Sequence, residues 1–130
     1  MLDLNDLIGI PYKKGGNGEE GFDCYRLVRE VKRRLGEKLP EFSSLTEDES
    51  IHQMVLDNVD FVEQIENPEP YCLVVFKVGA PVFNHIGIVL EDCDYFIHIL
   101  KNRVVEIHRL SALLWKNRAH RFYRWKGKSN

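Results

Sequence analysis

The sequence lacks the features that mark membrane proteins, nucleic-acid-binding proteins and repeat proteins. No apolar run approaches the roughly 18–20 residues of a membrane-spanning helix. Lysine and arginine total 18 against 20 aspartates and glutamates, so the net charge of −2 provides no overall basic field for nucleic acid. There is also no internal repeat, low-complexity tract or obvious linker. These absences predict one globular domain over residues 1–130, with neither a membrane nor a nucleic acid as partner.

Cysteines are too few and too widely spaced for two common structural roles. Cys24, Cys72 and Cys93 form no CxxC pair and no zinc-finger pattern with a histidine pair. A disulfide framework and a structural zinc site are therefore not indicated, and we expect no metal ion. Cys72 lies in the apolar run YCLVVFKV and is interpreted as a packing residue. Cys93, in the acidic turn EDCD, is interpreted as a surface thiol.

The two ends of the chain carry no clear targeting or binding signal. The opening MLDLNDLIGI has neither the basic region nor the apolar region of a secretory signal, so we expect synthesis in the cytoplasm without signal-dependent export. Basic side chains gather near the other end, at Arg118, Arg121, Arg124, Lys126 and Lys128. We interpret the last residues, 125–130, as a solvated and disordered tail.

Helix signals dominate the first half of the chain. A short helix is predicted in LDLNDLIGIPY, followed by the glycine-rich loop KKGGNGEEG. Asp23 is suited to cap a second helix, and Gly36 is suited to end it. The spacing TEDE, from Thr46, predicts a third helix that carries Ile51, Met54 and Val55 and ends before the breaker ENPEP.

Strand signals dominate the second half. The runs YCLVVFKV, HIGIVLE, YFIHIL and RVVEIHRL are rich in β-branched and aromatic residues, and Lys101-Asn102 fits a hairpin turn between the last two. SALLWKNR predicts one or two helical turns and AHRFYRW a closing strand. Helices followed by an antiparallel meander predict an α+β domain with its helices on one side of the sheet.

Cys24 is the cysteine whose position indicates chemistry. In GFDCYRLVREV it falls in the first turn of the predicted second helix, on the apolar side. Unpaired N–H groups at a helix start stabilise a thiolate. A packing cysteine can occupy any position along an apolar face, so placement alone does not assign a role.

Two histidines, His85 and His98, interrupt strongly apolar strands. Neighbouring antiparallel strands can bring their imidazoles together. Each one alone is more simply a core histidine bonded to backbone groups. Together with Cys24 they form a Cys-His-His set, in which a thiol has a base and the base has an orienting partner.

The remaining histidines are interpreted as lying outside this set. His108 alternates with the apolar Val105 and Ile107, so we expect it on the exposed face of its strand. His52 is expected to be exposed on the predicted third helix, and His120 lies beside the basic tail.

Taken together, these stretches resemble the NlpC/P60 cysteine peptidases, whose papain-like core sets a cysteine at a helix start against a small antiparallel sheet. The matching stretches GIPYKKGGNGEEGFDCYRLVREV, NHIGIVL and YFIHI span nearly the whole chain. The resemblance implies that Cys24 is the nucleophile, His85 the general base and His98 the residue that orients it. It is closest to a branch found in phage and prophage tail proteins, on the basis of the turn Leu39-Pro40 and the stretch FYR near the end of the chain.

Departures from the family pattern lie around the expected cleft. Tyr25 and Arg26 stand where most relatives have a small residue and then glycine, which predicts a bulkier and more basic rim. Lys14 replaces an aromatic residue usual before the Gly-Gly pair, although an aromatic ring remains nearby. The residues expected to bind substrate are Tyr12, Asp23, Tyr25, Arg26 and Asn84.

The resemblance implies hydrolysis of an amide in the stem peptide of bacterial peptidoglycan, commonly between D-glutamate and diaminopimelate or lysine, without metal or organic cofactor. Because no secretory signal is evident, incorporation into a phage tail, among tail proteins as partners, or release on lysis would bring the enzyme to the wall. Two alternatives stay open. One is a non-catalytic tail structural or assembly module on the same fold, and the other is a Cys-His-His acyl hydrolase with a different amide or ester substrate.

Overall fold

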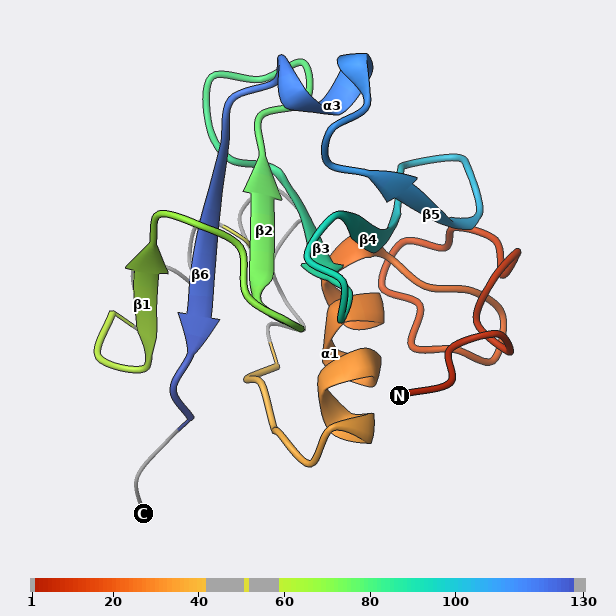
Figure 1. Ribbon diagram of the computed structural model, residues 1–130. Helices are drawn as coiled ribbons and strands as arrows, with labels where there is room; N and C mark the ends of the chain where they lie inside the picture. Colours follow the sequence, from red (N-terminus) through yellow and green to blue (C-terminus); the bar gives the residue numbers. More distant parts are fainter. Residues whose placement is uncertain (1, 42–50, 52–58, 128–130) are drawn as a thin grey trace.

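A six-stranded antiparallel sheet forms the centre of the part of the chain that the structure describes (Figure 1). The computed structural model describes residues 2–41, 51 and 59–127. The described elements are α1 (Cys24–Arg34), β1 (Val62–Ile65), β2 (Leu73–Phe76), β3 (His85–Val89), β4 (Tyr95–Ile99), β5 (Val105–Arg109), α3 (Leu113–Lys116) and β6 (His120–Trp125). The strand order is β1-β6-β2-β3-β4-β5, and each neighbouring pair is antiparallel.

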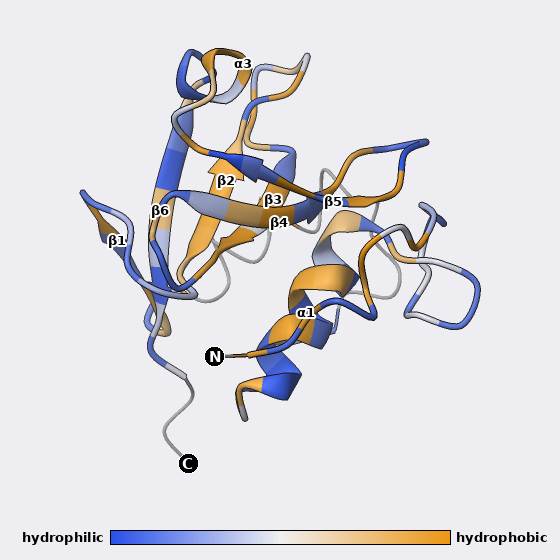
Figure 2. Ribbon diagram, turned by 45° about the vertical axis from the view of Figure 1, so that its right-hand side comes forward, coloured by the Kyte–Doolittle hydropathy of each residue, from blue (hydrophilic) through white to orange (hydrophobic). Residues whose placement is uncertain are grey.

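Each face of the sheet carries its own apolar layer, because successive side chains of a strand point to opposite faces. Helix α1 packs against β3 and β4 and buries an apolar stripe with Ile86 and Ile88 (Figure 2). On the other face, Trp115 of α3 packs with Phe76 and Phe96. The sheet therefore separates the α1 layer from an aromatic layer under α3, and the prediction that the helices lie on one side of the sheet is wrong for α1 and α3.

Helix α1 forms where its capping signals predict it. The Asp23 carboxylate accepts a hydrogen bond from the backbone N–H of Arg26, as an N-cap does. The buried positions include Leu27 and Val31, which follow helical spacing. Gly36 adopts a φ of 83°, a left-handed conformation that suits glycine and ends the helix.

The structure differs from the predictions near the amino terminus and before the sheet. The predicted first helix is a series of turns, because the N–H of Gly9 bonds to the carbonyl of Val105 in β5 instead of continuing a helix. Residues 62–65 form the strand β1, so the prediction that the third helix continues to the ENPEP breaker is wrong for these residues. Of the predicted third helix, Ile51 is helical and fully buried, whereas Met54 and Val55 lie outside the described residues.

The second half of the chain follows the prediction, with one correction at its end. The four predicted runs form β2 to β5, and Asn102 adopts a positive φ of 64° in the turn between β4 and β5. Trp125, which the sequence predictions placed both in the closing strand AHRFYRW and at the start of a disordered tail, is the last residue of β6 and is 7% exposed. Trp125 pairs with Val62 of β1, and because β1 was not predicted, this pairing was not predicted either. No helix within the described ranges is long and apolar enough to cross a membrane.

Candidate functional site

Three histidines form a hydrogen-bonded row across β3, β4 and β5. The Nε2 atom of His85 lies 2.8 Å from Nδ1 of His98. The Nε2 atom of His98 lies 2.7 Å from Nδ1 of His108. The structure thus brings together the two predicted histidines, and it adds a third one.

The strand register produces this row. His98 pairs with Glu106 across β4 and β5, and Phe96 pairs with His108, so the two histidines are diagonal neighbours on one face. Between β3 and β4, Gly87 lies against His98, and a Cβ atom at Gly87 would approach the Cβ of His98 to 3.1 Å and the carbonyl oxygen of Ile97 to 2.9 Å. The missing side chain of Gly87 therefore lets β3 approach β4 beside the histidines.

The indole of Trp115 covers all three imidazoles. Its ring centroid lies 6.0 Å from those of His85 and His108, with interplanar angles of 29° and 27°. It lies 4.8 Å from the His98 ring at 87°. Phe96 adds a second contact to the His98 ring, with centroids 4.4 Å apart. His85 is 4% exposed and His98 is 1% exposed, so both rings are shut off from water.

Burial determines the charge state of the two inner rings. Loss of hydration, the larger cause, and the nearby positive charge of Arg118 together lower the pKa of His85 to about 3. Burial also lowers the pKa of His98 strongly, with smaller contributions from the charges of His85, His108 and Arg103. Both rings are therefore neutral at neutral pH, and the burial that lowers the pKa of His85 also opposes protonation of its ring.

Cys24 occupies the first residue of α1, as predicted, and is fully buried. The helix start favours a thiolate, whereas burial opposes charge, so the two effects act in opposite directions. Cys24 and His85 are the first residues of α1 and β3, two elements that pack together. Contact between the Cys24 sulfur and the His85 ring stays a prediction.

Asp23 and Arg26, two of the predicted substrate-binding residues, hold the start of α1 in place. The Asp23 carboxylate accepts hydrogen bonds from the N–H of Gly15 at 3.2 Å and from the N–H of Arg26 at 2.7 Å. It also accepts one from the Arg26 guanidinium at 2.6 Å, and that guanidinium donates to Glu41 at 2.9 Å. These bonds tie the glycine-rich loop to the helix that bears Cys24, and a role in substrate binding stays a prediction.

Tyr25 and Asn84 have structural partners that the sequence did not reveal. Tyr25 is 1% exposed and its hydroxyl donates to the carbonyl of Pro40 at 2.6 Å, so it does not form the exposed rim that we expected. Burial raises the pKa of Tyr25 above its usual range. The Asn84 amide closes a turn by bonding both backbone groups of Val78 at 2.8 Å. Tyr12 is half-buried, and its N–H donates to the carbonyl of Arg103 at 2.8 Å.

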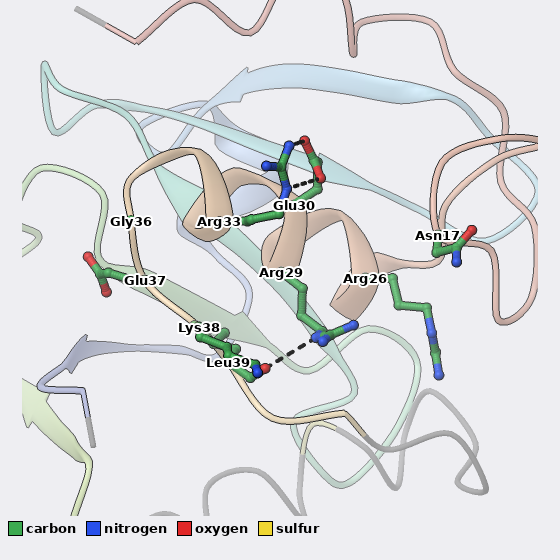
Figure 3. A pocket seen from close by; sticks show the side chains of 9 residues that line it. All are labelled: Asn17, Arg26, Arg29, Glu30, Arg33, Gly36, Glu37, Lys38 and Leu39. Carbon is green, nitrogen blue, oxygen red and sulfur yellow. Dashed lines mark hydrogen bonds and ion pairs between the residues drawn. The ribbon is translucent and has the colours of Figure 1, made fainter. Parts of the chain in front are cut away.

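A surface hollow lies along the outer side of α1 (Figure 3). Its lining residues are Asn17, Arg26, Arg29, Glu30, Arg33, Gly36, Glu37, Lys38 and Leu39. The arginines are paired, since Arg33 bonds Glu30 and Arg29 bonds both Glu41 and the carbonyl of Leu39. None of the three bonded histidines is among these lining residues, whereas Arg26, which helps to hold the start of α1, is one of them.

His108 and Trp115 are the residues of the site that sequence reasoning missed. The expectation that His108 is exposed is wrong, because it is half-buried and bonded to His98. The burial of His108 could have been predicted from the hairpin turn at Lys101-Asn102. The register that follows from this turn pairs His108 with Phe96 and places it on the same face as His98. The contacts of Trp115 depend on the loop that brings α3 over the sheet, and the local sequence does not encode that placement.

Metal binding has no support in the part of the chain that the structure describes. No group of histidine, cysteine, aspartate and glutamate side chains there is arranged to hold a metal ion. In the row, the four ring nitrogens that take part bond one another. The row is thus organised to orient protons between rings.

Comparisons with known proteins identify the fold. A model of the NlpC/P60 family matches residues 9–125. A solved structure described as similar to a lipoprotein of the NLP/P60 family, from Staphylococcus aureus subsp. aureus Mu50, matches with a TM-score of 0.65 and 22% identity over 95% of this chain. This chain spans 39% of the staphylococcal chain.

A second solved structure is the NlpC/p60 domain of the peptidoglycan hydrolase SagA. It matches with a TM-score of 0.59 and 18% identity, over 91% of this chain and 90% of the other. A search of curated proteins gives no match. The predicted papain-like α+β fold with an antiparallel sheet is confirmed.

Replacing Gly87 with alanine is expected to separate the histidines. The new methyl group would meet the Ile97 carbonyl, which is rigid backbone, so β3 and β4 must move apart. We expect a loss of about 1–3 kcal/mol in the free energy of unfolding, measured by urea denaturation. We also expect weakened contact between His85 and His98.

Gly79→Ala is the control for this substitution. Gly79 has a φ of 62° and open space around its Cβ position, so alanine there strains the backbone without touching a histidine. Ring 15N NMR signals of His98 should change in Gly87→Ala and not in Gly79→Ala. Unchanged His98 signals in both variants would contradict the role assigned to Gly87.

The buried histidines predict a pH dependence of stability. Their pKa values are lowered in the folded protein, so below about pH 6.5 the unfolded chain binds more protons than the folded protein does. The free energy of unfolding therefore decreases as the pH is lowered. Between pH 6.5 and 5 each ring should contribute a slope of up to about 1.4 kcal/mol per pH unit. Denaturant unfolding across this range measures the slope.

The double variant His85→Leu, His98→Leu is expected to lose this part of the slope, because it removes both titrating rings; it also deprives the half-buried His108 of its bond to His98. His120→Leu removes an exposed histidine and should keep the slope of the unmodified protein. A double variant with an unchanged slope would show that other groups cause the pH dependence.

Proposed function

Because the chain belongs to the NlpC/P60 family, whose members are generally cysteine peptidases and peptidoglycan hydrolases, we propose that it cleaves an amide in the peptidoglycan stem peptide. The bond proposed is the one between D-glutamate and diaminopimelate or lysine. The observation that supports this proposal most strongly is the buried hydrogen bond between His85 and His98, on the strands against which the Cys24 helix packs. SagA, one of the structural neighbours, is described as a peptidoglycan hydrolase.

In the proposed reaction, His85 is the base that activates Cys24. The Nε2 atom of His85 is engaged with His98, which leaves Nδ1 as the atom that takes the thiol proton. As that proton moves, the sulfur attacks the amide carbonyl and forms a tetrahedral intermediate. The His85 imidazolium then protonates the leaving amine, and neutral His85 next deprotonates a water molecule that releases the acyl group from the sulfur.

The start of α1 and His98 stabilise the two charges that develop, the oxyanion of the intermediate and the imidazolium of His85. The backbone N–H of Cys24, the first residue of α1, is the proposed donor to the oxyanion of the intermediate. His98 accepts the Nε2–H of His85 and so stabilises the imidazolium that forms. Because both rings are buried, these hydrogen bonds act in a low-dielectric surrounding, where electrostatic interactions are stronger.

The complete burial of Cys24 favours one competing function, a structural or assembly module that keeps this fold without hydrolysis. A substrate carbonyl reaches the sulfur only if the groups that cover it move. The competing function and the peptidase function differ in whether the thiol is required for release of peptide fragments.

Digestion of purified peptidoglycan separates these two functions. We expect the unmodified protein to release stem-peptide fragments, identified by mass, and Cys24→Ala to release none. Cys72→Ala is the matched control, because it removes a thiol that is also buried but lies in the aromatic layer under α3. Release of no fragments by either protein would contradict the peptidase function and leave the structural module, and release of the same fragments by both would show that Cys24 is not the nucleophile.

We also place the protein, as a further proposal, in a phage or prophage tail. The turn Leu39-Pro40 after the cysteine helix and the stretch FYR near the chain end support this placement. Tail particles purified from an induced lysate should then contain peptides of this chain, detected by mass spectrometry. Recovery of the chain from the free soluble fraction alone would contradict this placement.

A further inference from the structure

We propose that His108 is a positioning residue of the site, which fixes the tautomer of His98 and thereby leaves Nδ1 of His85 free of its proton. This inference rests on the proposed cysteine peptidase function. It concerns a residue on β5, beyond the Cys-His-His set. The geometry that carries it is the continuous row of three imidazoles under Trp115.

Each hydrogen bond in the row contains one proton between two ring nitrogens. In one arrangement, His98 holds its proton on Nε2 and donates it to Nδ1 of His108. Its own Nδ1 then accepts the Nε2–H of His85. Neutral His85 has only one proton, so its Nδ1 is bare and can act as a base.

The opposite arrangement disables the base. If His98 holds its proton on Nδ1, it donates to Nε2 of His85, and the single proton of His85 then sits on Nδ1. The atom that should receive the thiol proton is thereby occupied. The direction in which the N–H groups of the row donate thus decides whether His85 can act as a base. His108 is the last ring of the row, so its Nδ1 decides whether Nε2 of His98 donates or accepts.

His108 imposes the productive direction when its own proton is on Nε2, because its Nδ1 is then a hydrogen-bond acceptor. Its Nδ1 lies 2.7 Å from Nε2 of His98, within the range of a good hydrogen bond, and it is half-buried at the outer end of the row. The Trp115 indole lies nearly parallel to the His108 and His85 rings and nearly perpendicular to the His98 ring. These contacts keep each ring nitrogen directed at its neighbour.

The row also supports the charged state of His85. When His85 becomes an imidazolium, it donates from Nε2 to His98, which in turn donates to His108. Consecutive hydrogen bonds of this kind polarise one another, which moves part of the positive charge toward the less buried end. Removing the acceptor at residue 108 is therefore expected to impair both the resting tautomer and the charged intermediate.

Ring 15N NMR of histidine-labelled protein near pH 7.5 tests the tautomer directly. In the unmodified protein we expect His98 with a bare Nδ1 and a protonated Nε2. In His108→Leu, which has no acceptor, we expect the opposite or a mixed tautomer. In His108→Asn, whose Oδ1 replaces the Nδ1 acceptor, we expect the tautomer of the unmodified protein. His120→Leu, on the exposed end of β6, is the control and should change nothing.

Peptidoglycan hydrolysis provides the second readout. We expect kcat to fall at least about tenfold in His108→Leu with KM little changed, and most of it to return in His108→Asn, because a wrong tautomer of the base is costly in related triads. If His108→Leu does not fold, His108→Val takes its place with the same expectation, since it also offers no acceptor and valine suits a strand.

Two results would overturn the proposal for His108. One is a His98 tautomer that is the same in His108→Leu as in the unmodified protein, and the other is an unmodified protein in which His98 carries its proton on Nδ1. If the unmodified protein hydrolyses no peptidoglycan, the proposed function fails, while the tautomer measurement still decides what His108 does.

Discussion

The site depends on the hydrogen bond between Nε2 of His85 and Nδ1 of His98, buried between a sheet and an indole ring. Both side chains are almost completely removed from water, so neither can replace the other with a water molecule. A buried polar group left without a partner costs about 1–3 kcal/mol, and each ring is therefore tied to its partner. The close approach of β3 and β4 at Gly87 serves this bond.

The residues of the candidate site lie on both faces of the sheet. The strands and Trp115 build and cover the histidine row on one face, while α1 packs on the other and supplies Cys24 at its first residue. Asp23 holds that residue by capping the helix and by tying the glycine-rich loop to it. In the proposed mechanism the thiol and its base thus come from opposite faces of the sheet, on α1 and β3, two elements that pack together.

Much of this arrangement could be predicted from local patterns, because helix caps and strand alternation act over a few residues. Asp23 marked the start of α1, and the apolar strands around His85 and His98 placed both rings on neighbouring strands. The strand β1 was overlooked because its four residues pair with β6, some sixty positions away. His108 and Tyr25 were misplaced for a similar reason, since pairing across β4 and β5 and the carbonyl of Pro40 determine their burial.

The central claim is that Cys24 and the histidine row act as one catalytic unit. An experimental structure of the protein, determined by crystallography, would measure the distance from the Cys24 sulfur to Nδ1 of His85. The account predicts a distance of about 4 Å or less, with Nδ1 directed at the sulfur, as a nucleophile and its base require even when somewhat loosened without substrate. A His85 ring with Nδ1 turned away and the sulfur beyond about 6 Å would contradict it.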